Sequence, residues 1–594
     1  MIGTDGEIPA RRIWIALGTL TAVFHLGLIF YGLVPNLVAR PLHMALTLPW
    51  VFLFAATGPV SRASGAILAG LGIAGCLWIA LNHQMLRNQY GFLENQFQVG
   101  LAILLLGVAM EGARRAIGWP LPLVALAALL YGLYGQHIPG EFGHAGTPLQ
   151  SFLGTLIVAE GGLWGSLTGV SVGVVAIFVI FGAVLNAGEA GQGFMNVAAA
   201  AAGRLTGGAA KVSVLSSALF GSISGSASAN VASTGAITLP AMTKLGYPKR
   251  LAAATEAVAS SGGQIMPPLM GAGAFVMVEL TGVPYSEIML AALLPAILYF
   301  ATVWQGLNAF ASRFDLQPIP EEDRPARRQV LITSAFFMVP FSTLLIAMFA
   351  LGYTPQYAAA LAIFTGLALL FIDVSLRPNP GQGLARLGDA MLNAGRQVAM
   401  IASIIICASI IIGVLGITGL GVKITSVILS GSGGELWPAL MLTALACLLL
   451  GMEVPTTAAY VICVSVAGPA LIELGLEPLQ AHLFVFWFAL LSTITPPVCG
   501  AVFIASGMVQ ENWLRVALTA MALGVGLYII PLAMIANDAL IRVSTEPVAA
   551  LLAMAMVGLG LGGISRGLIG RGPWWRRLAL GGLGGSLCFA GLWL

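Results

Sequence analysis

The sequence predicts an all-α polytopic membrane protein. Two observations support this prediction: the amino-acid composition and the hydropathy. Of the 594 residues, 58% are hydrophobic and only 8% are charged, whereas a soluble domain carries about 25% charged residues. The mean hydropathy is +0.95, and about 20 apolar residues suffice to cross a bilayer. This composition excludes a soluble enzyme, a nucleic-acid-binding protein and a disordered scaffold. The net charge of +3 indicates no partner, because 26 basic residues nearly balance 23 acidic ones.

Residues 1–136 are predicted to form a membrane domain of five spans, at 13–34, 43–60, 65–81, 97–113 and 119–136. The first span is too long for the apolar part of a signal peptide and is followed by no cleavage site, so we interpret it as retained. Basic residues fall in alternate connections (Arg11, Arg12, Arg62, Arg114 and Arg115), with Arg40 and Arg87 as exceptions, and 137–150 holds no Lys or Arg. The positive-inside rule therefore predicts a cytoplasmic N-terminus.

A second, larger domain is predicted over residues 166–538. An external loop and amphipathic helix at 137–165 lead to spans at 168–185, 286–310, 330–351, 355–374 and 397–417. The polar connection 313–328 and the basic link 377–396 are expected on the cytoplasmic side. Extra C-terminal spans at 547–564 and 578–593 are predicted within 539–594, around a loop that carries four arginines (Arg566, Arg571, Arg576 and Arg577).

Two stretches interrupt the apolar helices and form an internal repeat. The first, FGSISGSASANVASTGAITLPAMTKLGYP from Phe220 to Pro248, leads into SSGGQIMPPLMGA at 260–272. The second, GMEVPTTAAYVICVSVAGPALIELGLEP from Gly451 to Pro478, leads into LSTITPPVCGA at 491–501. Matched residues keep one constant offset along the chain: Pro240 and Pro469, Gly246 and Gly475, Pro267 and Pro496, Pro268 and Pro497, Gly271 and Gly500. The copies, around 212–311 and 436–537, predict two helical hairpins, each followed by a broken helix.

Broken helices inside a membrane predict a binding site. They survive only where they are buried in protein or line a cavity, and corresponding interruptions in two halves point to the central site of a transporter. Adjacent prolines free the carbonyls one turn back, and hard cations prefer oxygen ligands. Taken alone, each Gly- and Ser-rich tract also fits a helix-packing face.

The candidate residues group by segment. They are Ser224, Gly225, Ser226, Ser228, Asn230 and Thr234 in the first hairpin, and Gly262, Gly263, Gln264, Pro267 and Pro268 in the first broken helix. In the second copy they are Glu453, Pro455, Thr456 and Thr457 in the hairpin, and Ser492, Thr493, Thr495, Pro496, Pro497 and Gly500 in the broken helix. Glu453 is expected either to ligate a cation or to cap a half-helix, because a carboxylate within an apolar hairpin is costly.

The other chemistry-bearing residues predict no second site. Glu256 and Glu279 flank the first break and are interpreted as helix-end or interfacial residues. The six cysteines lie in apolar runs without a CxxC pair, and the six histidines show no ligand spacing. The GxSxG at 563–567 lacks a strand–turn–helix context, and no GxxxxGK[ST] occurs. We therefore expect no catalytic residue, no ATP site and no cofactor other than a coupling ion.

The run GSISGSASANVASTGAITLPAM, with GYP and ASSGGQIMPPLMGAGAFVMVELTGVPY after it, resembles the large membrane subunit of tripartite ATP-independent periplasmic (TRAP) transporters. Within that family it is similar to fused permeases that work with TAXI-type solute receptors, and residues 1–136 resemble the fused small subunit in layout. The resemblance implies an inverted-repeat, elevator-type transporter with two re-entrant hairpins in a bacterial inner membrane. It also implies sodium-coupled uptake of a small carboxylate that an extracytoplasmic solute-binding protein delivers, with sodium bound within the candidate regions.

Two other functions stay open at this stage. One is a stand-alone sodium/dicarboxylate symporter, which would need no receptor and no five-span N-terminal domain. The other is an intramembrane enzyme, which would need a nucleophile and a base together. The nearest histidine to such a site is His482, which leads into the second double proline.

Overall fold

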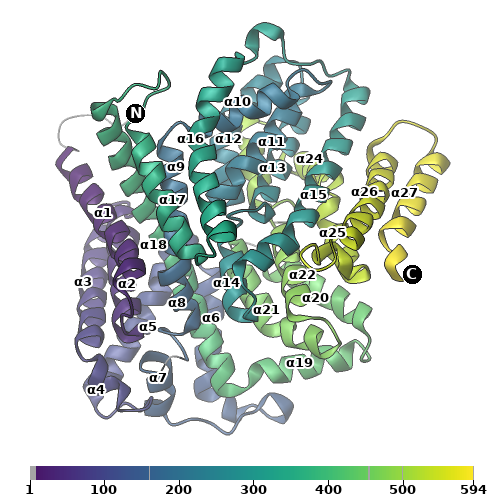
Figure 1. Ribbon diagram of the computed structural model, residues 1–594. Helices are drawn as coiled ribbons and strands as arrows, with labels where there is room; N and C mark the ends of the chain where they lie inside the picture. Colours follow the sequence, from purple (N-terminus) through teal and green to yellow (C-terminus); the bar gives the residue numbers. More distant parts are fainter. Residues whose placement is uncertain (1–7, 160, 452–454, 498, 593–594) are drawn as a thin grey trace. The chain divides into compact units, whose positions relative to one another are not determined.

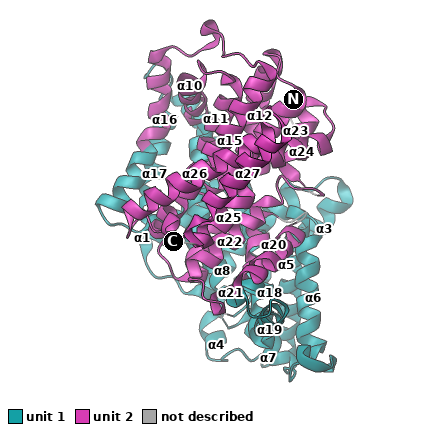
Figure 2. Ribbon diagram, turned by 90° about the vertical axis from the view of Figure 1, so that its right-hand side faces the viewer, with its two compact units in different colours: residues 1–188, 340–435, 465–470 teal, residues 189–339, 436–464, 471–594 magenta. Residues whose placement is uncertain are grey.

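The computed structural model describes residues 8–159, 161–451, 455–497 and 499–592, and every named element among them is a helix (Figure 1). Within this described part, 11 helices are long and apolar enough to cross a membrane. The predicted all-α polytopic membrane protein is thereby confirmed. The chain divides into two compact units, residues 1–188, 340–435 and 465–470, and residues 189–339, 436–464 and 471–594 (Figure 2).

The first unit is built around one long helix, α18 (Pro380–Thr418). Helices α1, α2, α5, α6, α8, α9 and α17 all contact α18. Their bounds are α1 Ile8–Tyr31, α2 Asn36–Pro49, α5 Gln96–Ile117, α6 Pro120–Tyr134, α8 Ser166–Val170, α9 Ala176–Ala187 and α17 Pro355–Leu370. The unit also holds α3 Pro59–Leu81, α4 His83–Arg87, α7 Leu149–Ile157 and α19 Leu420–Gly431. Its short segments are the π-helices η1 Trp50–Phe54, η4 Ser171–Val175 and η7 Ile346–Ala350, and the 3₁₀ helices η2 Gly135–His137 and η3 Gly140–Phe142.

The predicted basic link at 377–396 is wrong, because α18 already begins at Pro380. Asn379 caps this helix by accepting a hydrogen bond from the amide of Gln382, and the proline that follows is favourable in the first turn. The polar half of α18 lies beside the start of α1, where Arg11 and Asp389 form a 2.6 Å ion pair. The polar residues at 377–396 therefore indicate that the surroundings of α18 change along its length, and they do not mark the end of a helix.

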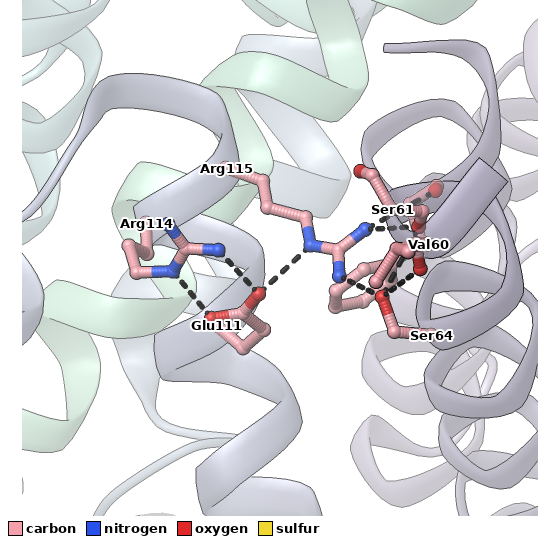
Figure 3. Close-up of polar contacts among 7 residues, drawn as sticks. Val60, Ser61, Ser64, Glu111, Arg114 and Arg115 are labelled. Atoms are coloured by element: carbon pink, nitrogen blue, oxygen red, sulfur yellow. Dashed lines mark hydrogen bonds and ion pairs between the residues drawn. The ribbon is translucent and has the colours of Figure 1, made fainter. Parts of the chain in front are cut away.

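Arg115 fastens the end of α5 to the start of α3 (Figure 3). Its guanidinium donates to the carbonyl of Ser61 at 3.1 Å and to the hydroxyl of Ser64 at 3.0 Å, while Glu111 accepts from it at 2.8 Å. Glu111 also accepts two hydrogen bonds from Arg114. Arg62, near the start of α3, and Arg114 and Arg115, near the end of α5, therefore lie at helix ends that contact each other.

A buried chain of two histidines ties three segments of the first unit together. His25 Nδ1 lies 2.7 Å from the carbonyl oxygen of Thr21, His25 Nε2 lies 2.8 Å from His43 Nδ1, and His43 Nε2 lies 3.0 Å from the hydroxyl of Ser171. A carbonyl can only accept, so His25 carries its proton on Nδ1, His43 donates from Nδ1, and Ser171 donates to His43. In this arrangement every ring nitrogen of the two histidines has a hydrogen-bond partner while both rings are neutral.

The second unit contains both copies of the repeat, apart from residues 465–470 of the second copy. Its helices are α10 Ala190–Ala202, α11 Gly208–Ser224, α12 Ala227–Lys244, α13 Lys249–Gly262, α14 Ala272–Thr281, α15 Tyr285–Phe314, α20 Leu436–Leu450, α22 Pro478–Leu491, α23 Gly500–Val509, α24 Trp513–Leu523, α25 Gly526–Ala536, α26 Pro547–Ile569 and α27 Trp574–Cys588, with turns η5 Gly263–Ile265, η6 Glu321–Asp323, η8 Asp538–Ile541 and η9 Ala590–Leu592. The unit boundaries fall inside α16 (Arg327–Leu345) and α21 (Thr456–Glu473).

The C-terminal pair α26–α27 packs through glycine. A methyl group at Gly560 would lie 2.5 Å from the carbonyl oxygen of Gly584, so the two backbones touch directly. Only α26 is among the helices with the length and hydropathy of a membrane span; α27, which opens with two tryptophans and two arginines, is not.

Candidate functional site

The first hairpin consists of α11 and α12, which lie side by side in the second unit (Figure 1). α11 ends at Ser224, and Gly225 turns the chain with a left-handed φ of 62°, a conformation that favours glycine. Ser226 then caps α12, since its hydroxyl accepts from the amide of Ala229. The first hairpin is thus formed by two helices joined by a turn at Gly225.

The first break follows α13. The chain tightens into a 3₁₀ turn at Gly263–Ile265, passes through Pro267 and Pro268, whose bond is cis, and resumes as α14 at Ala272. The carbonyl of Gln264, which Pro268 leaves without its helical donor, accepts instead from the amide of Gly271 at 2.7 Å. Tyr285 donates its hydroxyl to the carbonyl of Pro268 at 2.6 Å. The break is thus largely satisfied by protein groups, as a buried interruption must be.

The second break has the same construction. α22 ends at Leu491, Pro496 and Pro497 are joined by a cis bond, and α23 begins at Gly500. The carbonyl of Thr493 accepts from the amide of Ala501 at 3.2 Å, matching the bond across the first break. No amide of the described residues donates to the carbonyl of Ser492, one turn before Pro496.

Each hairpin lies against its own break. A methyl group at Gly221 of the first hairpin would lie 2.4 Å from the Cα of Gly263. In the second copy a methyl group at Gly451 would lie 3.0 Å from the Cβ of Ser492. Gly221 lies in the last turn of α11, and Gly451 directly follows α20. Both contacts therefore join the end of a helix to the first residue of a break, so the two copies of the repeat also pack alike.

The two copies also cross. The hydroxyl of Thr493 donates to that of Ser261 at 2.8 Å, which joins the second break to the helix before the first. A methyl group at Gly500 would lie 3.6 Å from the hydroxyl of Ser228, in the first hairpin. These contacts place the two broken helices and the first hairpin next to one another within the second unit.

Other predicted residues stand apart from these contacts. Glu453 lies outside the described residues, as do its two neighbours. Pro455 precedes α21, and the hydroxyls of Thr456 and Thr457 in its first turn form no hydrogen bond with any described residue. Thr495 shares a 2.6 Å hydrogen bond with the hydroxyl of Tyr528. The side chains of Asn230 and Thr234 are buried and already hydrogen-bonded inside the first hairpin.

The interpretation of Glu256 as a helix-end or interfacial residue is wrong. Its side chain is 0% exposed and accepts hydrogen bonds from five hydroxyls, those of Ser213, Ser217, Thr234, Thr238 and Ser260. Glu279, by contrast, is exposed on α14. The sequence does carry a signal for the cluster, because Ser213 and Ser217, Thr234 and Thr238, and Glu256 and Ser260 are each four residues apart and so share a helix face.

Comparison with known protein families shows to which family the chain belongs. Residues 103–549 match the family model described as "Tripartite ATP-independent periplasmic transporter, DctM component". The chain belongs to this family. Membership in it makes the chain a component of a multi-pass membrane transporter and removes the intramembrane-enzyme alternative.

Relatives of the TRAP permease include a fused form. The chain is 25% identical over 441 residues to the isethionate TRAP transporter permease protein DctMQ of Oleidesulfovibrio alaskensis, covering 69% of this chain and 67% of the relative. It is 25% identical to the C4-dicarboxylate TRAP transporter large permease protein DctM of Pseudomonas aeruginosa, over 58% of this chain and 79% of the relative. It is also 25% identical to the 2,3-diketo-L-gulonate TRAP transporter large permease protein YiaN of Escherichia coli, over 57% of this chain and 77% of the relative.

Proposed function

We propose that this TRAP permease takes up a small carboxylate by sodium-coupled secondary transport in a bacterial inner membrane, with its N-terminus in the cytoplasm. An extracytoplasmic solute-binding protein of the TAXI type delivers the substrate. The names of the three relatives describe carriers of a sulfonate, a dicarboxylate and a sugar acid, all of them small organic anions. The observation that carries the proposal is the crossing of two interrupted helices at Thr493 and Ser261.

Sodium is the coupling ion that the oxygen-rich breaks favour. The carbonyl of Ser492 and the hydroxyls of Thr456 and Thr457 are oxygen atoms with no hydrogen-bond partner among the described residues. In the same part of the chain, no group of three His, Cys, Asp or Glu residues could hold a metal ion. Neutral oxygens suit a monovalent hard cation. Co-bound sodium offsets the charge of a carboxylate, and each sodium contributes about 2.3 kcal/mol per 100 mV of membrane potential.

An elevator movement fits the division of the chain into units. Both hairpins and both breaks belong to the second unit, apart from residues 465–470 in the middle of α21. A binding site carried almost wholly by one compact body can move with that body. We therefore assign the second unit, with its crossed breaks, to the moving part, and the α18-centred unit to the stationary part.

Two contacts in the first unit support the proposed orientation. Arg11 pairs with Asp389 near the start of α18, and Lys423, just after α18, donates to the carbonyl of Gly143 in the arginine-free loop 137–150. α18 therefore runs from the end that holds the N-terminal arginines to the end that holds this loop. The positive-inside rule assigns those ends to the cytoplasm and the exterior, respectively.

The test is uptake by the full chain in proteoliposomes. We expect uptake of a labelled carboxylate only when the solute-binding protein encoded beside this chain is outside the vesicles and a sodium gradient points inward. Uptake without that protein would identify a stand-alone sodium/dicarboxylate symporter. Uptake that a proton gradient drives equally well without sodium would overturn the sodium assignment.

A further inference from the structure

The carboxylate cluster around Glu256 includes none of the oxygens assigned to sodium above, which are those of Ser492, Thr456 and Thr457. Its six members are at most 4% exposed and come from three helices, α11, α12 and α13. Ser213 donates to one carboxylate oxygen at 2.8 Å, Ser217 and Ser260 each donate to the other at 3.2 Å, and Thr234 and Thr238 complete the set.

No cation neutralises this carboxylate within the described part of the chain. The elements packed on α13 carry few charged or titratable groups: Lys211 on α11, Lys244 on α12, Tyr285, Glu287, Tyr299 and Arg313 on α15, Arg515 on α24, none on α23 or η5, and Lys249 and Arg250 on α13 itself. Among these described groups none forms an ion pair or hydrogen bond with Glu256. Tyr299 donates to the carbonyl of Val258 instead, and the ammonium of Lys211 lies 5.1 Å from the ring centre of Trp304. An isolated ionised carboxylate in such a place is very costly.

The hydroxyls around Glu256 can satisfy either protonation state. When the carboxylate is ionised, all five donate to it. When it holds a proton, Thr234 can donate to the carbonyl of Asn230 at 2.8 Å, Thr238 to the carbonyl of Thr234 at 3.1 Å, and Ser217 to the hydroxyl of Thr234 at 3.1 Å. The new carboxyl O–H can then donate to Ser213, Ser217 or Ser260. A network with two complete arrangements suits a group that gains and loses one proton.

The cluster is also connected to the crossed breaks. Ser260 is followed directly by Ser261, which accepts the hydrogen bond from Thr493 in the second break. Asn230, whose amide lies between Gly221 and Gly263, donates to the carbonyl of Ser217 at 2.9 Å. A change in the ligands bound at the breaks can therefore affect the hydrogen-bond partners of Glu256 through Ser261 and through Asn230.

We propose that Glu256 is a proton-binding site of this permease, in addition to the sodium site, and that one proton accompanies substrate through it. The proposal rests on the proposed transport function. One proton joins a carboxylate oxygen of Glu256 from the exterior, which removes one buried negative charge, and the same proton leaves to the cytoplasm after the substrate.

Infrared spectroscopy tests the proton site without any transport. In full-length protein a carboxyl C=O band should rise and fall reversibly with pH, and this band should be lost in Glu256→Gln but kept in Glu279→Gln, the exposed carboxylate on α14. Thr238→Val should move the midpoint of the band to higher pH by about one unit, because one donor to the ionised form is lost. Thr243→Val, on the same helix but bonded only to backbone carbonyls, should not move it. A wild-type protein without a titrating carboxyl band, or one whose band survives in Glu256→Gln, overturns the proposal.

Proteoliposomes with an internal pH dye then test the coupling. With a sodium gradient and no pH gradient, receptor-dependent uptake by the wild-type protein should acidify the interior. Glu256→Gln should lose this acidification and at least 10-fold of net uptake, while substrate exchange at equal concentrations is retained, since exchange needs no net proton movement. Equal losses of uptake and exchange, or uptake without acidification in the wild type, overturn the proposal. A wild type that takes up substrate without sodium contradicts the proposed function alone.

Discussion

Thr493 of the second break donates a 2.8 Å hydrogen bond to Ser261, which lies in the last turn of α13, just before the first break. These residues are 232 positions apart in the chain, and they belong to opposite copies of the repeat. The bond joins the second break to the last turn of α13, the helix that leads into the first break. Movement of either break is therefore expected to be felt by the other.

This bond should appear as non-additivity in a double-mutant cycle. Thr493→Val and Ser261→Ala should each lower the free energy of unfolding by about 1 kcal/mol, since one buried hydrogen bond is lost. The double variant should cost little more than either single one, and the coupling should be about 0.5–1.5 kcal/mol. Melting of the detergent-solubilised full chain measures it. Strictly additive losses would show that the two hydroxyls do not interact.

The contact between hairpin and break should tolerate no side chain. Gly221→Ala places a methyl group 2.4 Å from the Cα of Gly263, so the backbones must separate. We expect a loss of about 1–3 kcal/mol in stability and loss of uptake. Gly507→Ala on α23, where nothing lies within 4 Å, is the matched control and should be near neutral. Equal melting temperatures for both variants would contradict the close approach.

Thr456 and Thr457 should set the sodium requirement. Replacing both by Val removes two oxygens that have no protein partner among the described residues, while the shape of the side chains is kept. The sodium concentration for half-maximal uptake should rise several-fold. Thr519→Val on α24, whose hydroxyl bonds to the carbonyl of Arg515 in its own helix, serves as control. An unchanged sodium dependence would remove the two threonines from the site.

The histidine chain in the first unit should show one tautomer. Because His25 donates to the carbonyl of Thr21, both His25 and His43 should be neutral with the proton on Nδ1. Nitrogen NMR of the labelled protein distinguishes the two ring nitrogens directly. Ser171→Ala should disturb the signals of His43 more than those of His25. A proton on Nε2 of either ring would contradict the inferred direction of the chain.

The repeat and its breaks could be predicted from the sequence, because prolines and glycines have local consequences. Paired prolines end a helix wherever they occur, and Gly225 marks a turn that favours a left-handed residue. The start of α18 could not be placed in the same way, because charged residues are common both in loops and on helices that leave the membrane. The polar residues indicated where the chain leaves the apolar environment, but they did not indicate where α18 begins.

Glu256 could not be placed from its own neighbourhood in the sequence. Whether a carboxylate in the middle of α13 is exposed or enclosed depends on which faces of three helices meet, and the sequence near Glu256 does not determine this. The spacing of four between Ser213 and Ser217 and between Thr234 and Thr238 shows that polar faces exist. It does not show that they point at the same atom.

The 39 residues of α18 give a rod of about 58 Å, whereas the hydrocarbon core of a bilayer is about 30 Å thick. The apolar residues of this rod lie in its C-terminal part, so several turns before them must stand in water or among lipid headgroups. The Arg11–Asp389 pair lies on that projecting part, where both side chains are about half exposed. A water-soluble thiol reagent applied from one side of the membrane should therefore react with a cysteine introduced in this part of α18. The side from which it reacts would report on which side of the membrane the N-terminus lies.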